Sequence, residues 1–546
     1  MPTSPPYADL VLRNGKILTL AQGLHVTEAL AVKDGLVMAS GLISEVDRLV
    51  GPTTEVVDLD GRTVIPGIND GHMHPIGMGT FSPPFTLSVR KQDVSSIADI
   101  RRVVAEAVRT KKPGEWIRGF GWDVGALAED RMPTRWDLDD LTPDNPVVLV
   151  QWSGHASWVN SRALEIAGIT GATEPPPGGE IVKDEAGEPT GVLTEGAAWA
   201  MNAVIPPYSR EERLSALITA TRTMGAYGIT SFTDAGLDLE ALQIYREAIE
   251  SGDLPQRVTL MIMASKVGDL RSALAAAVQI ETDPRRLQIS QVKIAADGVP
   301  TQAKTAWVSE PYRGGGTGGL TLPGDSHEAQ LAQFQEWVDT AHSMGFQVGT
   351  HATGDRAIIA AIDAYERATA TYGTAVRHYV IHSDFPYADV LRRMALGGFA
   401  ATFNPNIKQT TADQLVEVMG RERIDYEWPY RTALAAGVRV SSSSDAPVVA
   451  PSFQEGLYTM LTRRSRASGI VYGPGETIAL EEALRTYTVA PAWQDCAEGW
   501  KGTLAPGMVA DLVVLDGDLL TSRPEDILDL GVALTMVGGR TIYEAC

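Results

Sequence analysis

The sequence predicts an α/β protein built around a (β/α)8 barrel of the TIM type, with a composite β-sandwich domain made from both termini and a large insertion after the first barrel strand. Two observations predict this class. The middle of the chain alternates strand-like apolar runs with helical patterns, which is typical of a parallel sheet. Both ends contain only short β-like runs separated by turn residues.

Residues 1–66 are predicted to form the first part of the β-sandwich. Apolar runs in this segment are interrupted at Asn14 and Asp34, each of which precedes a glycine. Asn-Gly and Asp-Gly pairs are typical of tight hairpin turns. Residues 490–546 repeat this pattern and are predicted to form the second part. Two separate β-rich appendages are the alternative.

Residues 67–489 are predicted to form the barrel. Eight strand-like runs, the number that a (β/α)8 barrel needs, end near His72, Asp234, Ala264, Asp297, His351, His382, Asn404 and Asp445. The first two ends lie far apart in the sequence, so we expect an insertion of about residues 80–215 between them. Insertions after a barrel strand lie over the C-terminal face, where the active site is found.

Composition limits the classes of protein. The chain has 546 residues, of which 44% are hydrophobic, and its mean hydropathy of -0.05 is ordinary for a soluble enzyme. No apolar run is long enough to predict a membrane span, and no secretory signal is visible. Because only Cys496 and Cys546 occur, a cytoplasmic location is expected. The net charge of -22 argues against nucleic acids and anionic membranes as partners and is interpreted as a contribution to solubility. The expected partner is a small-molecule substrate.

His72 and His74 are the first candidate metal ligands. They follow the apolar run at residues 63–65. Side chains two residues apart on a strand point to the same side, so both imidazoles can bind one metal ion. Imidazole suits zinc and several neighbouring transition metals. For this pair alone, two surface histidines at a turn are the alternative.

Lys293, His351, His382 and Asp445 also lie at or near predicted strand ends. Because these ends meet at one face of a barrel, we expect the four side chains to join the two histidines of the first strand. Taken singly, the other histidines are more often packing residues, and an aspartate at such a place is more often a turn or helix cap. Together the six residues predict a centre for one or two divalent ions, with zinc the expected metal.

Lys293 is the least expected member of this set. It lies between Val292 and Ile294 in a run that is suited to burial, and a buried ammonium is costly unless it is paired or neutralised. An ion pair with Asp297 or another acid is one interpretation. The functional interpretation is a carboxylated lysine, formed with CO2, whose carboxylate bridges two metal ions about 3.5–4 Å apart.

The insertion is expected to form much of the substrate pocket. Trp122 and Trp152 are predicted to supply an apolar wall, although buried tryptophans usually fill a core. His155 is predicted to contact the substrate carbonyl or another polar group, and a capping or packing role beside Trp158 is the alternative. Outside the insertion, Arg313 opens a glycine-rich run that is predicted to be a flexible lid, and it is a candidate substrate contact.

These residues resemble the amidohydrolase superfamily, and the resemblance covers nearly the whole chain. The family pattern places His-x-His on the first barrel strand, lysine on the fourth, histidine on the fifth and sixth, and aspartate on the eighth. The matching residues here are His72, His74, Lys293, His351, His382 and Asp445. Segments 292–298 and 444–447 are similar to the branch that includes N-substituted formamide deformylases, of the amidohydrolase family 3 type. Ile381 departs from that branch, which usually has glutamate there.

The resemblance implies a metal-dependent amidohydrolase that cleaves a C–N bond other than a peptide bond, in an N-formyl or N-acyl amine. Metal ions lower the pKa of a bound water from 15.7 towards about 7. Asp445 is expected to act as general acid and base, with His155 as a second catalytic residue. The alternatives are deamination, or hydrolysis of a cyclic amide or ester, on the same site. A non-catalytic binding protein is the third hypothesis, and a homodimer is compatible with the sequence.

Overall fold

The computed structural model describes residues 7–545, with residues 153, 155, 177, 178, 195, 302, 374 and 375 and the side chain of residue 199 left out. The chain divides into two compact units. Unit 1 comprises Met1–Pro75 and Ile218–Cys546, and unit 2 comprises Ile76–Leu217. Among the helices in the described ranges, none has both the length and the apolar composition that crossing a membrane requires.

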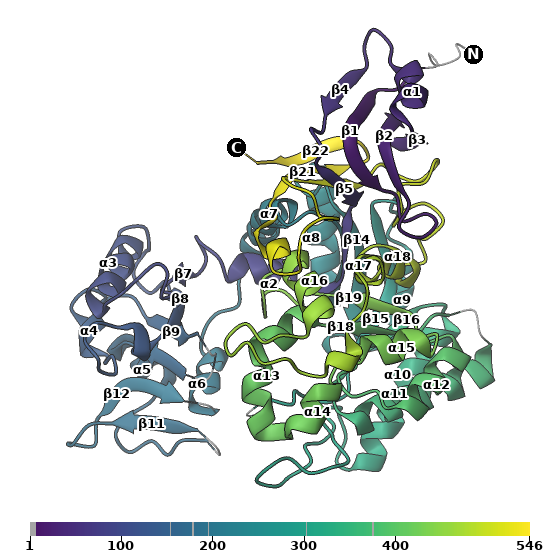
Figure 1. Ribbon diagram of the computed structural model, residues 1–546. Coiled ribbons are helices and arrows are strands. Elements are labelled where there is room, and N and C mark those ends of the chain that lie inside the picture. The colour runs from purple at the N-terminus through teal and green to yellow at the C-terminus, as the bar shows by residue number, and fades with distance from the viewer. Residues whose placement is uncertain are drawn as a thin grey trace. The chain divides into compact units, whose positions relative to one another are not determined.

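Eight parallel strands of unit 1 form the barrel (Figure 1). In chain order they are β6 (Ile68–Met73), β13 (Ile229–Leu237), β14 (Arg257–Met263), β15 (Leu287–Ala295), β16 (Gln347–Ala352), β17 (Tyr379–His382), β18 (Ala400–Phe403) and β19 (Val440–Ser442). Each strand pairs in parallel with the one that follows it. The predicted eight-stranded barrel is therefore confirmed.

Two backbone hydrogen bonds join the ends of the first and the last barrel strand. The amide of Asp445, just after β19, donates to the carbonyl of His72 in β6 at 3.0 Å. The amide of His74 donates to the carbonyl of Ala446 at 2.8 Å. These bonds lie at the C-terminal ends of both strands, so the predicted ligands of the first and eighth strands are brought side by side.

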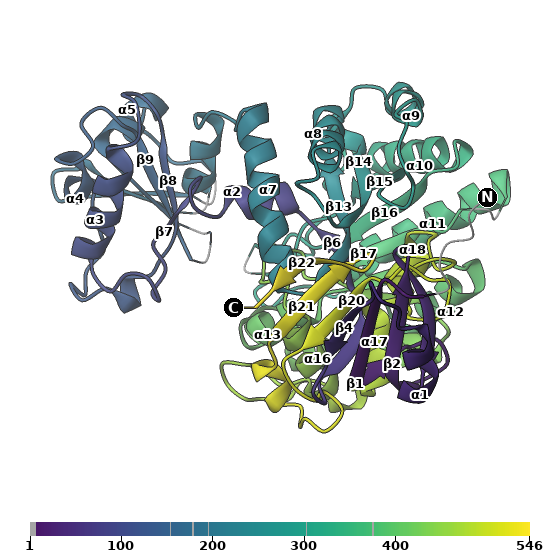
Figure 2. The same ribbon diagram turned by 90° about the horizontal axis from the view of Figure 1, so that it is seen from above.

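Most residues of the barrel strands are buried, because parallel strands are covered on both faces. In β14, every residue from Arg257 to Ile262 is buried. Helices cover the outer face, and Figure 2 shows α8, α9 and α10 outside strands β13–β16. Side chains cap the N-termini of several of these helices. Asp238 accepts a hydrogen bond from an amide in the first turn of α8, and Ser326 does the same for α10.

The helices that accompany the barrel strands begin with α7, which precedes β13. They are α7 (Arg210–Ala226), α8 (Leu239–Glu250), α9 (Leu270–Val278), α10 (His327–Ser343), α11 (Asp355–Tyr372), α12 (Ala388–Gly397), α13 (Pro405–Met419), α14 (Arg421–Tyr426), α15 (Tyr430–Ala435), α16 (Phe453–Thr462), α17 (Leu480–Thr486) and α18 (Val489–Gln494). The alternation of strands and helices that the sequence predicts is thus present.

The two chain ends share one sheet in unit 1, where purple and yellow arrows lie side by side in Figure 1. Its strands are β1 (Leu10–Leu18), β2 (Val26–Lys33), β3 (Leu36–Gly41), β4 (Glu55–Asp58), β5 (Thr63–Pro66), β20 (Leu512–Leu515), β21 (Val532–Val537) and β22 (Arg540–Glu544), with the short helix α1 (Ile43–Val46) after β3. β20 pairs with β5, and one buried core includes Leu12, Val64 and Val514. Both termini therefore build one sheet, and its sandwich form stays a prediction.

Unit 2 holds a mixed sheet of six strands in the order β11-β12-β10-β9-β8-β7. The elements of this segment are α2 (Pro75–Thr80), β7 (Leu87–Ser88), α3 (Ile97–Val108), β8 (Ile117–Trp122), α4 (Trp136–Asp139), β9 (Val147–Gln151), β10 (Ala156–Val159), α5 (Ser161–Ala167), β11 (Glu180–Lys183), β12 (Pro189–Thr194) and α6 (Gly196–Ala200). Leu149 of β9 shares a core with Ile100 of α3, and its neighbour Val148 shares another with Leu164 of α5. Helices therefore cover both faces of this sheet.

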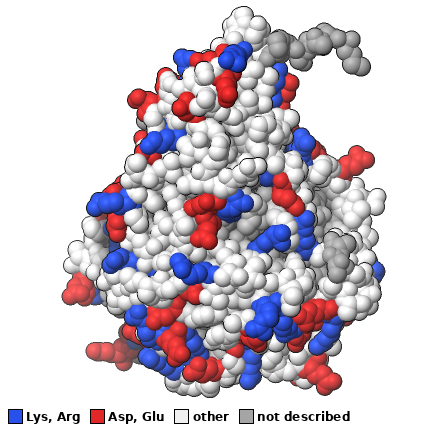
Figure 3. Space-filling view, turned by 45° about the vertical axis from the view of Figure 1, so that its right-hand side comes forward, with Lys and Arg blue, Asp and Glu red and all other residues white. Residues whose placement is uncertain are grey.

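The surface carries charges of both signs. On the face shown in Figure 3, Lys and Arg side chains lie among Asp and Glu side chains, and wide areas between them are uncharged. The chain has 68 acidic and 46 basic residues, but the acidic side chains do not form one continuous patch on this face.

A buried ion pair connects the terminal sheet to the barrel. Nε and Nη2 of Arg257, the first residue of β14, donate to the two carboxylate oxygens of Asp511 at 2.7 and 3.0 Å. The two side chains are 8% and 7% exposed. Asp511, which directly precedes β20, also accepts a hydrogen bond from the amide of Gly538 at 2.8 Å. One carboxylate thus joins β14 to two segments of the C-terminal sheet.

We expect Asp511→Asn to lower the free energy of unfolding by about 3–5 kcal/mol, because the substitution leaves the Arg257 guanidinium buried without its counter-charge. Urea unfolding followed by circular dichroism measures the change. The matched control is Asp526→Asn, whose exposed partner is Arg523, and it should change stability by at most about 1 kcal/mol. Equal effects of the two substitutions would show that the buried pair does not hold the sheet to the barrel.

Candidate metal centre and active site

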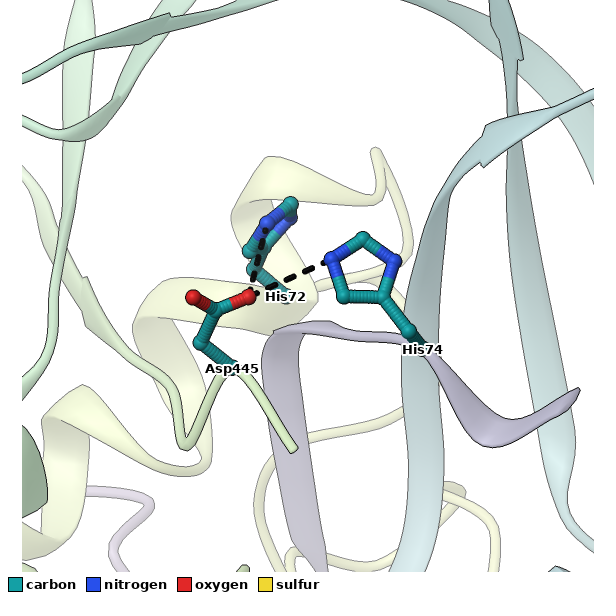
Figure 4. A group of neighbouring side chains, drawn as sticks. All are labelled: His72, His74 and Asp445. Carbon is teal, nitrogen blue, oxygen red and sulfur yellow. Dashed lines mark ion pairs between the residues drawn. The ribbon is translucent and has the colours of Figure 1, made fainter. Parts of the chain in front are cut away.

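Three predicted ligands converge at the seam of the barrel. Oδ1 of Asp445 lies 3.4 Å from Nε2 of His72 and 3.2 Å from Nε2 of His74 (Figure 4). Zinc bonds of about 2.0–2.1 Å in tetrahedral geometry separate neighbouring ligand atoms by about 3.3 Å. The spacing of these three atoms therefore fits a single metal ion.

The other three predicted ligands lie around the same point. Nζ of Lys293 is 3.3 Å from Nε2 of His72. The ring centre of His382 is 5.4 Å from that of His72 and 4.6 Å from that of His351. All six predicted ligands line one cavity of about 490 Å³. The structure thus brings together the whole set that the sequence indicates.

Hydrogen bonds orient three of the four histidines. Nδ1 of His74 bonds to the carbonyl of Ala235 at 2.9 Å, and Nδ1 of His382 bonds to Oδ1 of Asn404 at 2.7 Å. Nε2 of His351 bonds to the carbonyl of Gly298 at 2.8 Å. In each ring the nitrogen that faces an oxygen carries the proton. In His351 and His382 the other nitrogen keeps its lone pair, which is how ligand histidines are normally held, whereas Nε2 of His74 faces Oδ1 of Asp445.

Burial keeps most of these imidazoles neutral. It lowers the pKa of His72 and of His351 well below the usual value, and it lowers the pKa of His382 to about 4. At His74 burial acts in the same direction, but the hydrogen bond and charge of Asp445 outweigh it and raise the pKa. Neutral imidazole and ionised carboxylate are the forms that bind metal. In addition, Nδ1 of His72 has no hydrogen-bond partner within the described part of the chain. The donor set fits a divalent cation.

Asp445 is held in its ionised form. Burial alone would raise its pKa, but the hydrogen bonds from His72 and His74 hold the pKa well below the usual range. Next to it, the hydroxyl of Ser444 donates to Asp70 at 2.6 Å and so ties the segment after β19 to β6. The backbone of Asp445 has a φ of 57°, which is rare for a residue with a side chain and is typical of functional sites.

Lys293 is not paired with Asp297. The carboxylate of Asp297 instead accepts hydrogen bonds from the amides of Trp307, Thr353 and Gly354 at 2.9–3.0 Å. Burial lowers the pKa of Lys293 to about 7, and the charges of acids in the cavity offset only part of this effect. A substantial share of the amine is then neutral at neutral pH, which is the form that reacts with CO2.

Three of the four predicted substrate contacts are among the residues that the structure describes. Trp122 belongs to the core of unit 2, where its indole N–H donates to the carbonyl of Leu149 at 2.7 Å. Trp152, also in unit 2, is 52% exposed. Arg313 lines a different hollow of unit 1, together with residues of α14. His155 lies outside the described residues. For all four, contact with the substrate stays a prediction.

Ile381, the departure from the branch pattern, is fully buried in β17. It shares an apolar cluster with Ala235, Met261 and Tyr379. Its side chain therefore fills barrel core, directly before the ligand His382. No polar partner is available at this position for a substrate or for a neighbouring ligand.

The cavity also contains acidic residues that the sequence interpretation did not include. Asp384 and Glu427 both line it, together with apolar side chains such as Ile407, Leu415 and Trp428. Burial and the negative charges of nearby acids raise the pKa of Asp384 well above its usual value, as expected where negative charge is in excess. The signal for Asp384 was its position two residues after His382. No spacing signal marked Glu427.

Known proteins with similar sequences span the whole chain. YtcJ of Bacillus subtilis, an amidohydrolase-family protein, is 29% identical and covers 98% of this chain and 99% of its own length. N-substituted formamide deformylase of Arthrobacter pascens is 28% identical and covers 98% of both chains. Protein LONG AFTER FAR-RED 3 of Arabidopsis thaliana is 27% identical over 99% of this chain and 93% of its own.

Solved structures show the same fold. An uncharacterised metal-dependent hydrolase from Pyrococcus furiosus has a TM-score of 0.75 at 25% identity and covers 93% of this chain and 99% of its own. A second uncharacterised metal-dependent hydrolase, from Pyrococcus horikoshii, has a TM-score of 0.76 at 23% identity and covers 94% of this chain and 99% of its own. The family model described as the amidohydrolase family matches residues 55–543, a range that includes all six predicted metal ligands. This chain therefore belongs to the amidohydrolase family of hydrolases.

Proposed function

We propose that the protein is a metal-dependent hydrolase that cleaves the C–N bond of an N-formyl or N-acyl amine. The convergence of His72 Nε2 and His74 Nε2 on Asp445 Oδ1 at 3.2–3.4 Å carries the proposal, because such a group can hold a metal ion and lines a cavity of about 490 Å³. The similarity over the full length to an N-substituted formamide deformylase supports this choice of bond.

In this proposal His72, His74 and Asp445 would hold one zinc ion, and His351 and His382 would hold a second. Bound divalent ions supply an activated water and polarise the scissile carbonyl. Lys293 as a neutral amine adds to CO2 and releases one proton, and the resulting carboxylate joins the two ligand groups. Asp445 takes a proton from the attacking water and delivers it to the leaving nitrogen, since one of its oxygens is not engaged by the two histidines.

The substrate class is tested by a hydrolysis screen. The protein is loaded with zinc and incubated with N-formyl amines, N-acyl amines, carbamates and lactams, and the released amine and acid are measured. We expect the open-chain N-formyl or N-acyl amines to give the highest kcat/KM. Release of ammonia from ring amines, or turnover of cyclic substrates alone, would favour the deaminase or cyclic amide hydrolase alternative. Absence of any turnover by zinc-loaded protein would contradict the proposal.

Asp445→Asn is expected to lower kcat at least about 100-fold, which is the usual scale of general acid–base catalysis. The amide cannot take the proton, while the oxygen that remains can still contact the metal. Steady-state kinetics and metal analysis of the same sample measure both effects. The control is Asp389→Asn, at an exposed position on α12, which should leave turnover unchanged. Near-normal turnover of the Asp445 variant would exclude this residue as the proton carrier.

Lys293→Ala is expected to lose bound metal as well as activity, because it removes the carboxylate that bridges the two ions. Added acetate or propionate should restore part of both, since a free carboxylate can enter the space left by the side chain. Lys266→Ala is the matched control, because Lys266 lines the same cavity and its Nζ bonds to a backbone carbonyl. Unchanged metal content in the Lys293 variant would rule out the bridging role.

A further inference from the structure

The cavity has a second polar end, formed by Asp384 and Glu427. Both line the same space as the metal ligands, and they are only 3% and 0% exposed. The amide of Trp428 donates to the backbone carbonyl of Asp384 at 2.9 Å, which holds the two acidic segments together. Because Asp384 follows His382 by two residues, their Cα atoms are at most about 7 Å apart. The second polar end therefore lies close to the metal centre.

Each acid has one oxygen without a hydrogen-bond partner. Among the described residues, neither Oδ1 of Asp384 nor Oε1 of Glu427 accepts a hydrogen bond, although both atoms are buried. The other oxygen of Glu427 accepts from Nζ of Lys408 at 3.0 Å. Buried polar atoms are nearly always paired in folded proteins. Two unpaired acceptors on residues that line one cavity indicate a ligand that donates hydrogen bonds.

The charges around this end favour a cation. Asp384 and Glu427 are accompanied by Asp297, whose charge acts on Asp384, and they face two basic groups, Lys408 and Arg463. The guanidinium of Arg463 is bonded to four backbone carbonyls, so it donates to neither carboxylate. The charges of Glu427 and Asp297 both act on Asp384, so a cation placed beside Asp384 is attracted by more than one acid.

A primary ammonium group matches these features better than a metal ion. It carries a single positive charge and three donors, and it has no acceptor. The ammonium of Lys408, which already contacts Glu427, would repel a divalent cation more strongly than a monovalent one. Ile407, Leu415 and Trp428 line the same cavity and offer an apolar surface to the carbon chain of a ligand.

We propose that Asp384 and Glu427 bind a primary ammonium group of the substrate, so that the preferred substrates are N-formyl or N-acyl amines with a second, free amino group. The inference rests on the proposed function, since it places the scissile group at the metal centre and the ammonium at the second polar end. The two acids contact the part of the substrate that does not react, and they therefore determine specificity.

The test compares matched substrates. N-(ω-aminoalkyl)formamides with two to five methylene groups are paired with N-alkylformamides in which a methyl group replaces the ammonium. With the zinc-loaded protein, the best amino substrate should exceed its methyl partner about 10-fold or more in kcat/KM, as expected for charge-assisted hydrogen bonds. Asp384→Asn and Glu427→Gln should each reduce this ratio about 10-fold. The control is Glu417→Gln, an exposed substitution on α13, which should keep the ratio.

A second measurement separates this inference from the proposed function. Butylammonium chloride is titrated into the zinc-loaded protein by calorimetry, and into the two variants after circular dichroism has shown that they fold. Binding that is lost in the variants supports the ammonium site even if no formamide is hydrolysed, in which case only the proposed function fails. Equal hydrolysis of both substrates of each pair would overturn the inference and leave the function standing. The inference would also be overturned if the ratio of kcat/KM between amino and methyl substrates stayed unchanged in both folded variants.

Discussion

Closure of the barrel between β6 and β19 is the constraint on which the metal centre depends. His72 and His74 come from the start of the barrel and Asp445 from its end, and only the hydrogen bonds between these two strand ends place them within 3.4 Å. The bond between Ser444 and Asp70 reinforces the same seam. A shift of either strand by one residue would turn the ligands to the opposite face. Metal binding and barrel registry are thus linked in this protein.

The positions of the strand ends alone do not orient the ligand side chains. The local backbone conformation and hydrogen bonds to further residues also determine their orientation. Asp445, His382 and the adjacent Ser383 all have positive φ values, of 57°, 69° and 48°. Such conformations cost about 1–3 kcal/mol each and persist only where surrounding contacts enforce them. At His382, the bond of Nδ1 to Asn404 supplies one such contact. The strain is therefore located where a side chain must leave the strand direction and face the cavity.

Much of the fold and of the metal centre could be predicted from the sequence because both leave local signals. Buried parallel strands appear as apolar runs, and polar side chains such as His351 and His382 stand out where those runs end. The acidic end of the cavity left no such signal, because Glu427 follows α14 and its partner Lys408 lies on α13, and helical spacing does not indicate which residue reaches a distant cavity. Trp122 shows the same limit, since composition does not distinguish a core tryptophan from a pocket wall.

The two ends of the cavity differ in how their charges are balanced, and this difference decides what each can bind. At the seam, imidazoles that burial keeps mostly neutral surround one ionised carboxylate, so a divalent ion gains several lone pairs at short range. Around Glu427, the Lys408 ammonium already occupies one oxygen at 3.0 Å, which leaves a single unpaired acceptor on each acid. A dication is favoured at the first end and a monovalent hydrogen-bond donor at the second. A molecule with a carbonyl at one end and an ammonium at the other satisfies both ends at once.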